Sequence, residues 1–378
     1  MIYIDNAATT FPKPESVSRE VNRCLTSYCG NPGRGSHKMS LMASDAIFEA
    51  REKLTALVGV GDPTRCIFTL NTTYALNIAL KSLVKPGSHI LISDMEHNSV
   101  YRQVVKLNHD GIASYNIFST YRGNDDKMLC DIKRKIRNNT TVLICQISSN
   151  ISSLSMPVYR IGNLCRSKEI FFIADAAQSA GIINIDVDSM NIDALCVPSH
   201  KGLYGPQGAG AVIFSKRVSP LLRSFIEGGS GSDSLNPYMP DILPDKFEAG
   251  TMPTPAIAGL SKGIDFVKSY GIENISRHES SISNYLFDEL MSDKRYTVYG
   301  DDANSGIVLF NVKGHSSTEV SQELDKHGIC VRSGFHCAPL AHKTLKTGQS
   351  GAVRASFGVF NGISDAKILL DALYRITK

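Results

Sequence analysis

Helical and strand patterns alternate along most of this chain. Apolar residues at helical spacing occupy 44–58 and 75–84, and they alternate with short β-branched runs at 66–70 and 90–92. Five further short apolar runs lie at 113–118, 141–147, 169–174, 194–197 and 211–214. Uninterrupted apolar strands between helices are typical of a parallel sheet that is buried on both faces. The sequence therefore predicts an α/β fold around a mainly parallel, seven-stranded sheet.

The pattern changes after a stretch rich in Gly, Ser and Pro at 227–244, which indicates a surface loop leading to a domain boundary. Beyond it, helical patterns at 256–269, 273–292 and 318–327 flank strand patterns at 296–299 and 306–311. A chain of 378 residues also exceeds the size at which one core stops growing. We expect a large domain at 15–255 and a smaller α+β domain made of 1–14 and 256–378.

Composition excludes several classes of protein. The net charge of +4 comes from 40 basic and 36 acidic residues spread along the chain, without the basic stripe that nucleic-acid binding needs. Nine scattered cysteines without a Cys-x-x-Cys pair argue against a disulfide framework and a zinc site. No apolar run approaches eighteen residues, and the N-terminus does not resemble an export signal. We expect a cytoplasmic protein that binds no metal, membrane or nucleic acid.

Two charged residues follow strand patterns and suggest a cofactor. Lys201 comes soon after the run at 194–197, and Asp175 ends the run at 169–174. A lysine amine condenses with an aldehyde, and a carboxylate that keeps a pyridinium nitrogen protonated makes the ring an electron sink. Pyridoxal phosphate fits both features. Two plainer interpretations stay open, a solvated surface lysine and a helix N-cap at Asp175.

Other residues at strand ends fit an anion and a flat ring. Thr72 and Thr73 lie between a strand and a helix, where a helix N-terminus favours a phosphate. The alternative is that Asn71 or Thr72 only caps the helix. His97 follows another strand, at the sheet edge where open α/β sheets bind ligands. It can lie flat on a cofactor ring, or it is a structural or solvated histidine.

Two residues near the C-terminus are candidates for substrate chemistry. Cys337 lies in a loop with Arg332, Gly334 and His336, an electropositive setting that raises the thiolate fraction, whereas most cysteines are small buried apolar residues. Arg354 lies in a short strand pattern, where it either clamps a substrate carboxylate or forms a structural ion pair.

Nine short segments share their order with one known family. They are YIDNAAT at 3–9, NTT at 71–73, EH at 96–97, SN at 149–150, DAAQ at 175–178, HK at 200–201, FEAGT at 247–251, RSGFHC at 332–337 and RAS at 354–356. Together they resemble the class V aminotransferase fold group over essentially the whole chain, and within it the cysteine desulfurase and selenocysteine lyase family. The resemblance implies the PLP-dependent transferase fold, which is aspartate-aminotransferase-like, with the cofactor on the large domain of a homodimer.

The resemblance also implies roles for single residues. Lys201 would be the Schiff-base lysine, His97 would stack on the pyridine ring, and Asp175 would pair with the ring nitrogen, with Gln178 and Asn150 near the phenolic oxygen. The full set expected to hold pyridoxal phosphate is Thr72, Thr73, His97, Asn150, Asp175, Gln178, Ser199, His200, Lys201 and Thr251, the last from a neighbouring subunit. The residues expected beside the substrate are Ala7, Arg34, Asn150 and Arg354.

The chemistry that the resemblance implies is removal of sulfur from L-cysteine. Lys201 would remove the α-proton, and Cys337 would attack the substrate sulfur, which leaves a persulfide on Cys337 for an acceptor protein and releases L-alanine. The RSGFHC form resembles the second group of desulfurases. Two positions depart from the family pattern: Pro198 and Ser199 precede His200 where a hydroxyl residue and glycine are usual, and Gly33 stands where relatives often have histidine. Pro198 has no N–H to offer a phosphate.

Other functions remain open at this point. A selenocysteine lyase acting on L-selenocysteine needs the same residues. Another lyase, epimerase or transaminase of the fold is disfavoured by Cys337, because its chemistry needs no thiol. A regulator or scaffold that binds the cofactor without turnover is disfavoured by the joint presence of Lys201, His97, Asp175 and Arg354.

Overall fold

The computed structural model describes residues 1–33 and 35–377, so the predicted substrate residue Arg34 lies outside the described residues. Its largest sheet confirms the predicted α/β class. The strands are β2 (Cys66–Thr69), β3 (Ser88–Ser93), β4 (Ala113–Phe118), β5 (Thr140–Gln146), β6 (Phe171–Asp175), β7 (Ala194–Pro198) and β8 (Gly210–Phe214). They lie side by side in the order β2-β8-β7-β6-β5-β3-β4. Only β8 runs in the opposite direction to the other six strands, so the sheet is mainly parallel as expected.

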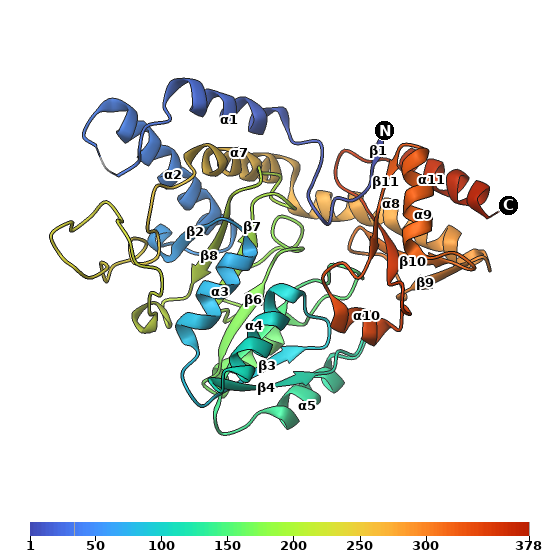
Figure 1. Cartoon of the computed structure of the whole chain (residues 1–378), viewed down its shortest axis with the longest axis horizontal. Coiled ribbons are helices and arrows are strands. Elements are labelled where there is room, and N and C mark those ends of the chain that lie inside the picture. The colour runs from blue at the N-terminus through green and yellow to red at the C-terminus, as the bar shows by residue number, and fades with distance from the viewer. Residues whose placement is uncertain (34, 378) are drawn as a thin grey trace.

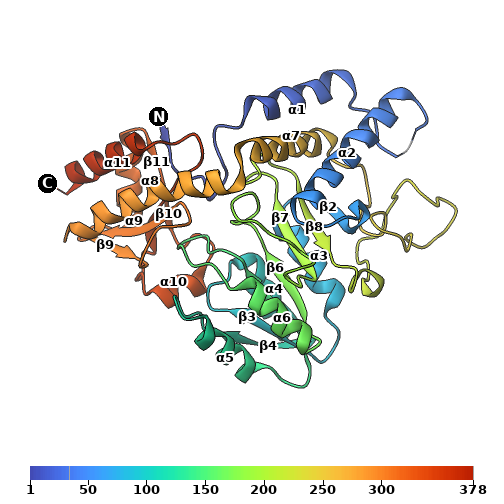
Figure 2. The ribbon, with the colours of Figure 1, turned by 180° about the vertical axis from the view of Figure 1, so that it is seen from behind.

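Helices cover both faces of this sheet, which explains its continuous apolar strands. The helices α3 (Thr72–Leu83) and α4 (Asn98–His109) pack on one face, while α2 (Lys38–Leu57), α5 (Asp125–Lys135) and α6 (Val158–Ser167) pack on the other (Figures 1 and 2). Successive side chains of a strand point to opposite faces. In β5, Val142 therefore joins the core under α3 and α4, and Leu143 joins the core on the other side.

The C-terminal part forms a second, antiparallel sheet. Its strands β9 (Tyr296–Tyr299), β10 (Ile307–Val312), β12 (Arg332–Gly334) and β13 (Ala352–Ser356) are ordered β12-β13-β10-β9. Around them lie α8 (Ile272–Ser292), α9 (Ser317–Lys326), α10 (Pro339–Leu345) and α11 (Ile363–Ile376). No helix among the described residues is long and apolar enough to cross a bilayer.

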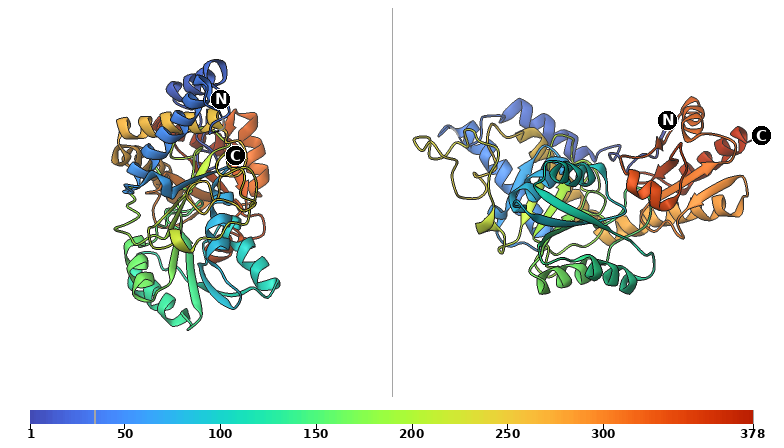
Figure 3. Two further views of the ribbon diagram at one scale, coloured as in Figure 1. Left: turned by 90° about the vertical axis from the view of Figure 1, so that its left-hand side faces the viewer. Right: turned by 60° about the horizontal axis from the view of Figure 1, so that its bottom comes forward.

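The N-terminal strand forms a separate two-stranded sheet with a strand of the C-terminal part. In β1 (Ile2–Tyr3), both residues pair in parallel with β11 (Ile329–Cys330), and the two ends of the chain lie at the same end of the molecule (Figure 3). The helix α7 (Thr254–Tyr270) packs on α1 (Glu15–Ser27) and α2. The predicted division at 255 stays a prediction, and α7 shows that the element after it still packs against the large unit.

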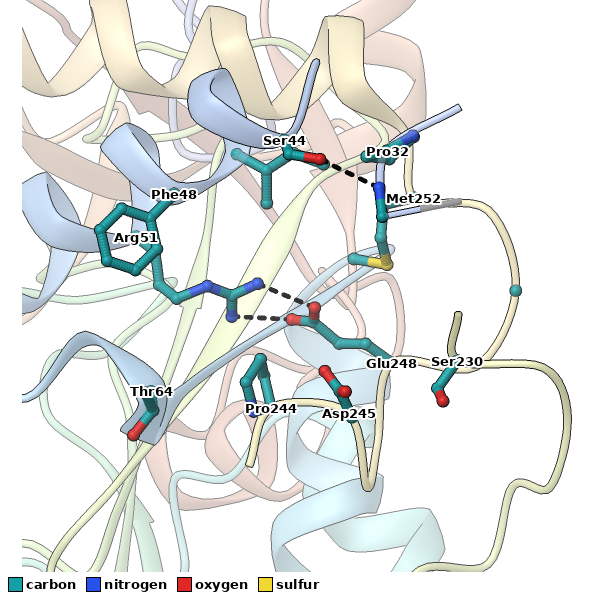
Figure 4. Close-up of a pocket in the computed structure, with 13 residues that line it drawn as sticks. Pro32, Ser44, Phe48, Arg51, Thr64, Ser230, Pro244, Asp245, Glu248 and Met252 are labelled. Carbon is teal, nitrogen blue, oxygen red and sulfur yellow. Dashed lines mark hydrogen bonds and ion pairs between the residues drawn. The ribbon is translucent and has the colours of Figure 1, made fainter. Parts of the chain in front are cut away.

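A buried ion pair fastens the segment that contains Thr251 to the large sheet. Arg51 of α2 and Glu248 form a bidentate pair, with Nη2 and Oε2 2.8 Å apart, at the wall of a cavity of about 240 Å³ (Figure 4). Glu248 Oε1 also accepts a hydrogen bond from the N–H of Phe68, 2.7 Å away. Both charged side chains are almost fully buried. Each therefore depends on the other, because an unpaired charge there has no water to solvate it.

We expect Glu248→Ala to lower the free energy of unfolding by about 3–5 kcal/mol, because it leaves Arg51 buried without a partner. The exposed pair of Arg19 and Glu15 provides the control, and Glu15→Ala should cost less than about 1 kcal/mol. Urea unfolding followed by circular dichroism measures both. Equal shifts of the two variants would contradict the role given to the buried pair.

Candidate active site

One cavity gathers residues from the carboxyl ends of the parallel strands. It has a volume of about 320 Å³. Its walls contain Ala8, Asn71, Thr72, Thr73, His97, Ser99, Gln146, Ser148, Asn150, Asp175, Ala177, Gln178, His200, Lys201, Arg332 and Cys337. Carboxyl ends of parallel strands meet at one edge of a sheet, which is where open α/β sheets bind ligands. Most of the predicted cofactor residues, and both predicted reacting groups, therefore lie around a single space.

Lys201 and Asp175 enter this cavity from neighbouring strands. Burial lowers the pKa of Lys201 to about 8, although the nearby Asp175 carboxylate raises it. Its ammonium group makes no hydrogen bond or ion pair that involves the described residues. Burial also raises the pKa of Asp175, against the opposing effects of the Ala177 N–H, 2.9 Å from Oδ1, and of Lys201. The site thus holds a reactive amine and a buried carboxylate that lacks a strong cationic partner.

His97 is both the cap of a helix and a wall of the cavity. Its Nδ1 accepts a hydrogen bond from the N–H of Ser99 at 3.0 Å, at the N-terminus of α4. Burial, followed by the charge of Lys201, lowers its pKa to about 4, so the imidazole is neutral near pH 7. The proton of the neutral ring is therefore on Nε2. His97 therefore has the structural role that the sequence left open, because it caps α4. The same hydrogen bond orients its imidazole ring in the wall of the cavity.

The side of the cavity near α3 has the features of an anion site. The hydroxyl of Thr72 and Nδ1 of His200 are buried and have no hydrogen-bond partner among the described groups. Asn71 caps α3 by accepting from the N–H of Tyr74, and Thr73 is exposed beside the cavity. Burial, then the charges of Lys201 and Lys13, lower the pKa of His200 to about 4. Unpaired donors at a helix N-terminus fit the phosphate of pyridoxal phosphate.

Two predicted phosphate residues lie elsewhere. Ser199 is fully buried, and its hydroxyl lies only 2.2 Å from where a Cβ on Gly205 would stand, so it faces that glycine instead of lining the cavity. It has no hydrogen-bond partner among the described groups. Thr251 is exposed and does not line this cavity either. Pro198 is the last residue of β7 and pairs with Gly210 of β8. It therefore forms part of the sheet and does not contribute to the predicted phosphate site.

Asn150 and Gln178 reach the cavity while holding other segments in place. The amide nitrogen of Asn150 donates to the carbonyl of His336 at 2.9 Å, and its Oδ1 is buried with no partner in the part of the chain that the structure describes. Nε2 of Gln178 donates to the carbonyl of Ala7 at 2.9 Å. Ala7 lines a smaller cavity of about 30 Å³ that it shares with Gln178 and Lys201. The N-terminal segment is thereby fixed next to the lysine.

Cys337 approaches the cavity from the opposite side, on the loop between β12 and α10. Its side chain is exposed, so the prediction of a reactive loop cysteine agrees with its placement better than a buried apolar role. A guanidinium nitrogen of Arg332 lies 3.9 Å from its Sγ. The carbonyl of Cys337 accepts from the N–H of Asn98 at 2.7 Å, next to His97. The Cys337 sulfur thus has a cationic neighbour at the mouth of the cavity.

Arg354 forms the ion pair that the sequence left as an alternative. Its Nη2 lies 2.6 Å from Oδ1 of Asp5, and its Nη1 donates to the carbonyl of Asn150 at 2.9 Å. It is fully buried, its Nε has no partner among the described groups, and it does not line the main cavity. Burial lowers its pKa, which the neighbouring Asp5 opposes. Binding of a substrate carboxylate by Arg354 stays a prediction.

Sequence reasoning missed several wall residues. Gln146 ends β5, and its Nε2 donates to the carbonyl of Met95 at 2.7 Å. Ser99, Ser148 and Ala8 also line the cavity. A polar residue that closes an apolar strand run was the available signal for Gln146, because Asp175 was found in the same way. Among the described residues, no cluster of His, Cys, Asp or Glu is arranged to hold a metal ion.

Comparison with known proteins agrees with this architecture. The model of the family described as aminotransferase class-V matches residues 2–369. A probable cysteine desulfurase from Methanothermobacter thermautotrophicus is 31% identical over 99% of this chain and 94% of its own length. A probable cysteine desulfurase from Pyrococcus abyssi is 31% identical over 100% of this chain and 94% of its own. The solved apo structure of a cysteine desulfurase from Thermococcus onnurineus superposes with a TM-score of 0.89, at 30% identity, covering 99% of this chain and 94% of that one.

The fold and the cavity define a pyridoxal phosphate-dependent enzyme, whose site has a lysine amine, a buried carboxylate and a set of unpaired anion donors around one space. The chain belongs to the class-V aminotransferase family, among the cysteine desulfurases.

We expect the Lys201 amine of cofactor-free protein to titrate near pH 8, because burial disfavours its charged form. Asp175→Asn should move this midpoint further down, since it removes the carboxylate that stabilises the ammonium. The pH dependence of acetylation by acetic anhydride, read peptide by peptide in a mass spectrometer, measures both. Exposed Lys133 gives the reference curve in the same sample. A Lys201 curve that coincides with that of Lys133 would contradict the argument from burial.

Proposed function

We propose that this chain transfers the sulfur of L-cysteine to Cys337 and releases L-alanine, with the residue roles given below. The observation that carries the proposal is that Lys201 and Cys337, which are distant in sequence, line the same cavity. A lysine alone serves every enzyme of the pyridoxal phosphate class. An exposed thiol beside a guanidinium, facing that lysine, is needed only where a sulfur atom is to be accepted.

Pyridoxal phosphate, when bound, withdraws electrons from the α-carbon of an amino acid. Thr72, Thr73 and His200 would hold its phosphate beside the N-terminus of α3, and Asp175 would face the ring nitrogen from the end of β6. Neutral His97 would lie against the ring with its proton on Nε2. Its Nδ1 is occupied by the Ser99 N–H, so the ring has one fixed orientation.

Lys201 would move the protons of the reaction. Near neutral pH part of its amine is uncharged, because burial lowers its pKa to about 8, so it can accept the proton from the substrate α-carbon. Cys337 Sγ would then attack the substrate sulfur. A sulfur–sulfur bond forms as the bond between the β-carbon and sulfur breaks, and the electron pair stays on the β-carbon. One proton then adds to the β-carbon, and Lys201 returns its proton to the α-carbon, which completes alanine. The product left on the protein is a persulfide at Cys337.

The active form proposed here is a homodimer in which Thr251 of the partner subunit completes the phosphate site. Thr251 is exposed and does not line the cavity of its own chain. In the segment 227–244, Leu235 is fully exposed and Tyr238 is 80% exposed, which suits burial against a second copy. Exposure of Cys337 supports onward transfer to an acceptor protein. The nine free cysteines support a reducing, cytoplasmic compartment.

The test is an absorption spectrum of the purified protein, taken before and after addition of L-cysteine, with alanine and the Cys337 persulfide measured in the same sample. We expect an absorption band of bound pyridoxal phosphate that changes when L-cysteine is added. Alanine and the Cys337 persulfide should form in equal amounts at the first turnover. Cofactor binding without alanine would overturn desulfuration and point to another amino acid. A parallel sample with L-selenocysteine measures the preference between sulfur and selenium.

Cys337→Ser is expected to reduce formation of alanine and persulfide from L-cysteine to background, while the cofactor band stays, because the serine hydroxyl is a poor acceptor of sulfur. The matched control is Cys330→Ser, a half-buried cysteine in β11 that lies outside the cavity and should keep full activity. Alanine release by the Cys337 variant at the rate of the unmodified protein would remove Cys337 from the mechanism.

A further inference from the structure

The loop that carries Cys337 has an unusual backbone. His336 and Cys337 both have positive φ angles, 49° and 55°, which residues with a Cβ rarely adopt in succession. Two hydrogen bonds hold the carbonyls of this turn, from Asn150 to His336 and from the N–H of Asn98 to Cys337. These two bonds hold the backbone of the turn on the side that faces the cavity. Other contacts hold the turn on its opposite side.

A chain of three buried side chains lies under the turn. Nε2 of His336 is 3.3 Å from the carbonyl oxygen of Arg332, and its Nδ1 is 3.0 Å from Nε2 of His342. Nδ1 of His342 is 2.7 Å from the hydroxyl of Thr347. The two imidazoles meet edge to edge, with ring centres 5.2 Å apart and planes 11° from parallel. His336, His342 and Thr347 are each exposed by less than 5%.

The positions of the protons in this chain follow from its first member. A carbonyl oxygen only accepts hydrogen bonds, so Nε2 of His336 carries a proton. In the neutral ring, Nδ1 of His336 must accept, and Nε2 of His342 therefore donates to it. Nδ1 of His342 must then accept from the hydroxyl of Thr347. The direction of donation runs from Thr347 through both imidazoles to the Arg332 carbonyl, with one proton arrangement for neutral rings.

Both imidazoles are neutral at working pH. Burial, then the charge of Arg354, lowers the pKa of His336 far below its usual value and that of His342 to about 4. Arg332 adds its charge against His336 in the same direction. A doubly protonated ring would reverse the donation in the chain, and the two nearby arginines disfavour it.

We propose that His342 and Thr347 are positioning residues for the nucleophile Cys337. They hold His336 in the tautomer that donates to the Arg332 carbonyl, which fixes the turn and keeps the Arg332 guanidinium next to the Cys337 sulfur. This inference rests on the proposed function, because it assigns the two residues to the thiol that accepts sulfur. His336 alone does not suffice, since without His342 its ring can adopt the other tautomer and lose the Arg332 contact.

The test compares Thr347→Val, which keeps the shape but removes the hydroxyl donor, with Thr347→Ser, which keeps the donor. With cofactor-loaded protein, Thr347→Val should lower kcat for L-cysteine about fivefold to tenfold, the effect of one net hydrogen bond, and change KM less than twofold. Thr347→Ser should restore kcat to within about twofold of the unmodified protein. kcat changes more than KM because neither residue lines the cavity that holds the substrate.

A second readout does not depend on turnover. Alkylation of Cys337 by iodoacetamide, measured in the loaded protein without substrate, should slow by a similar factor in Thr347→Val and in His342→Phe, because the Arg332 guanidinium is no longer held beside the Cys337 sulfur. His342→Phe keeps a flat ring beside His336 but removes the donor. Exposed Cys130 on α5 is the internal reference, and its alkylation rate should not change.

The possible outcomes separate this inference from the proposed function. If unmodified protein forms no persulfide on Cys337, the proposed function fails first. If persulfide forms, but Thr347→Val keeps the unmodified kcat and alkylation rate while its melting temperature falls, the chain of side chains only packs the loop. Equal losses of kcat and of the Cys337 alkylation rate in Thr347→Val and Thr347→Ser would also overturn the inference, because the hydroxyl of residue 347 would then not cause the effect.

Discussion

The constraint on which this structure depends is that a sheet buried on both faces has room for few polar groups except at its ends. Helices cover both faces of the seven-stranded sheet, so the side chains within its strands are mostly apolar. Charged and hydrogen-bonding side chains are therefore placed just where the parallel strands stop. Asp175 closes β6 and Lys201 follows β7, and burial shifts the pKa of each toward its neutral form. The same burial that stabilises the fold makes these groups reactive.

A second constraint joins the two ends of the chain to this edge. The guanidinium of Arg354, from the antiparallel sheet, binds both Asp5 of the N-terminal segment and the carbonyl of Asn150. Asn150 in turn donates to the carbonyl of His336, beside Cys337. One buried cation thus links the N-terminus, the carboxyl edge of the large sheet and the cysteine loop. Removal of any partner would leave a buried polar group without a hydrogen bond. This network therefore fixes the position of the two sheets relative to each other around the cavity.

Much of the architecture was accessible from pattern alone. All seven strands of the large sheet lie within two residues of the predicted runs, because strands buried on both faces give the strongest apolar signal. The helix α4 was not predicted, although its apolar residues follow a helical period. Ser199 was expected at the phosphate, yet its hydroxyl faces Gly205. Position in the sequence gave no information on the direction of that side chain, because the turn that brings Gly205 beside it sets that direction.

The sequence by itself determined which chemistry is available: an amine and a carboxylate that end apolar strands, a thiol in a cationic loop, and motifs in the order of one family. These are local properties, fixed by residue type and by neighbours in the chain. Only the tertiary structure decided which groups meet. It paired Arg354 with Asp5, placed Asn150 against the carbonyl of His336, and brought Lys201 and Cys337 to one cavity. Contacts between residues far apart in sequence depend on how sheets and helices pack, which no local pattern records.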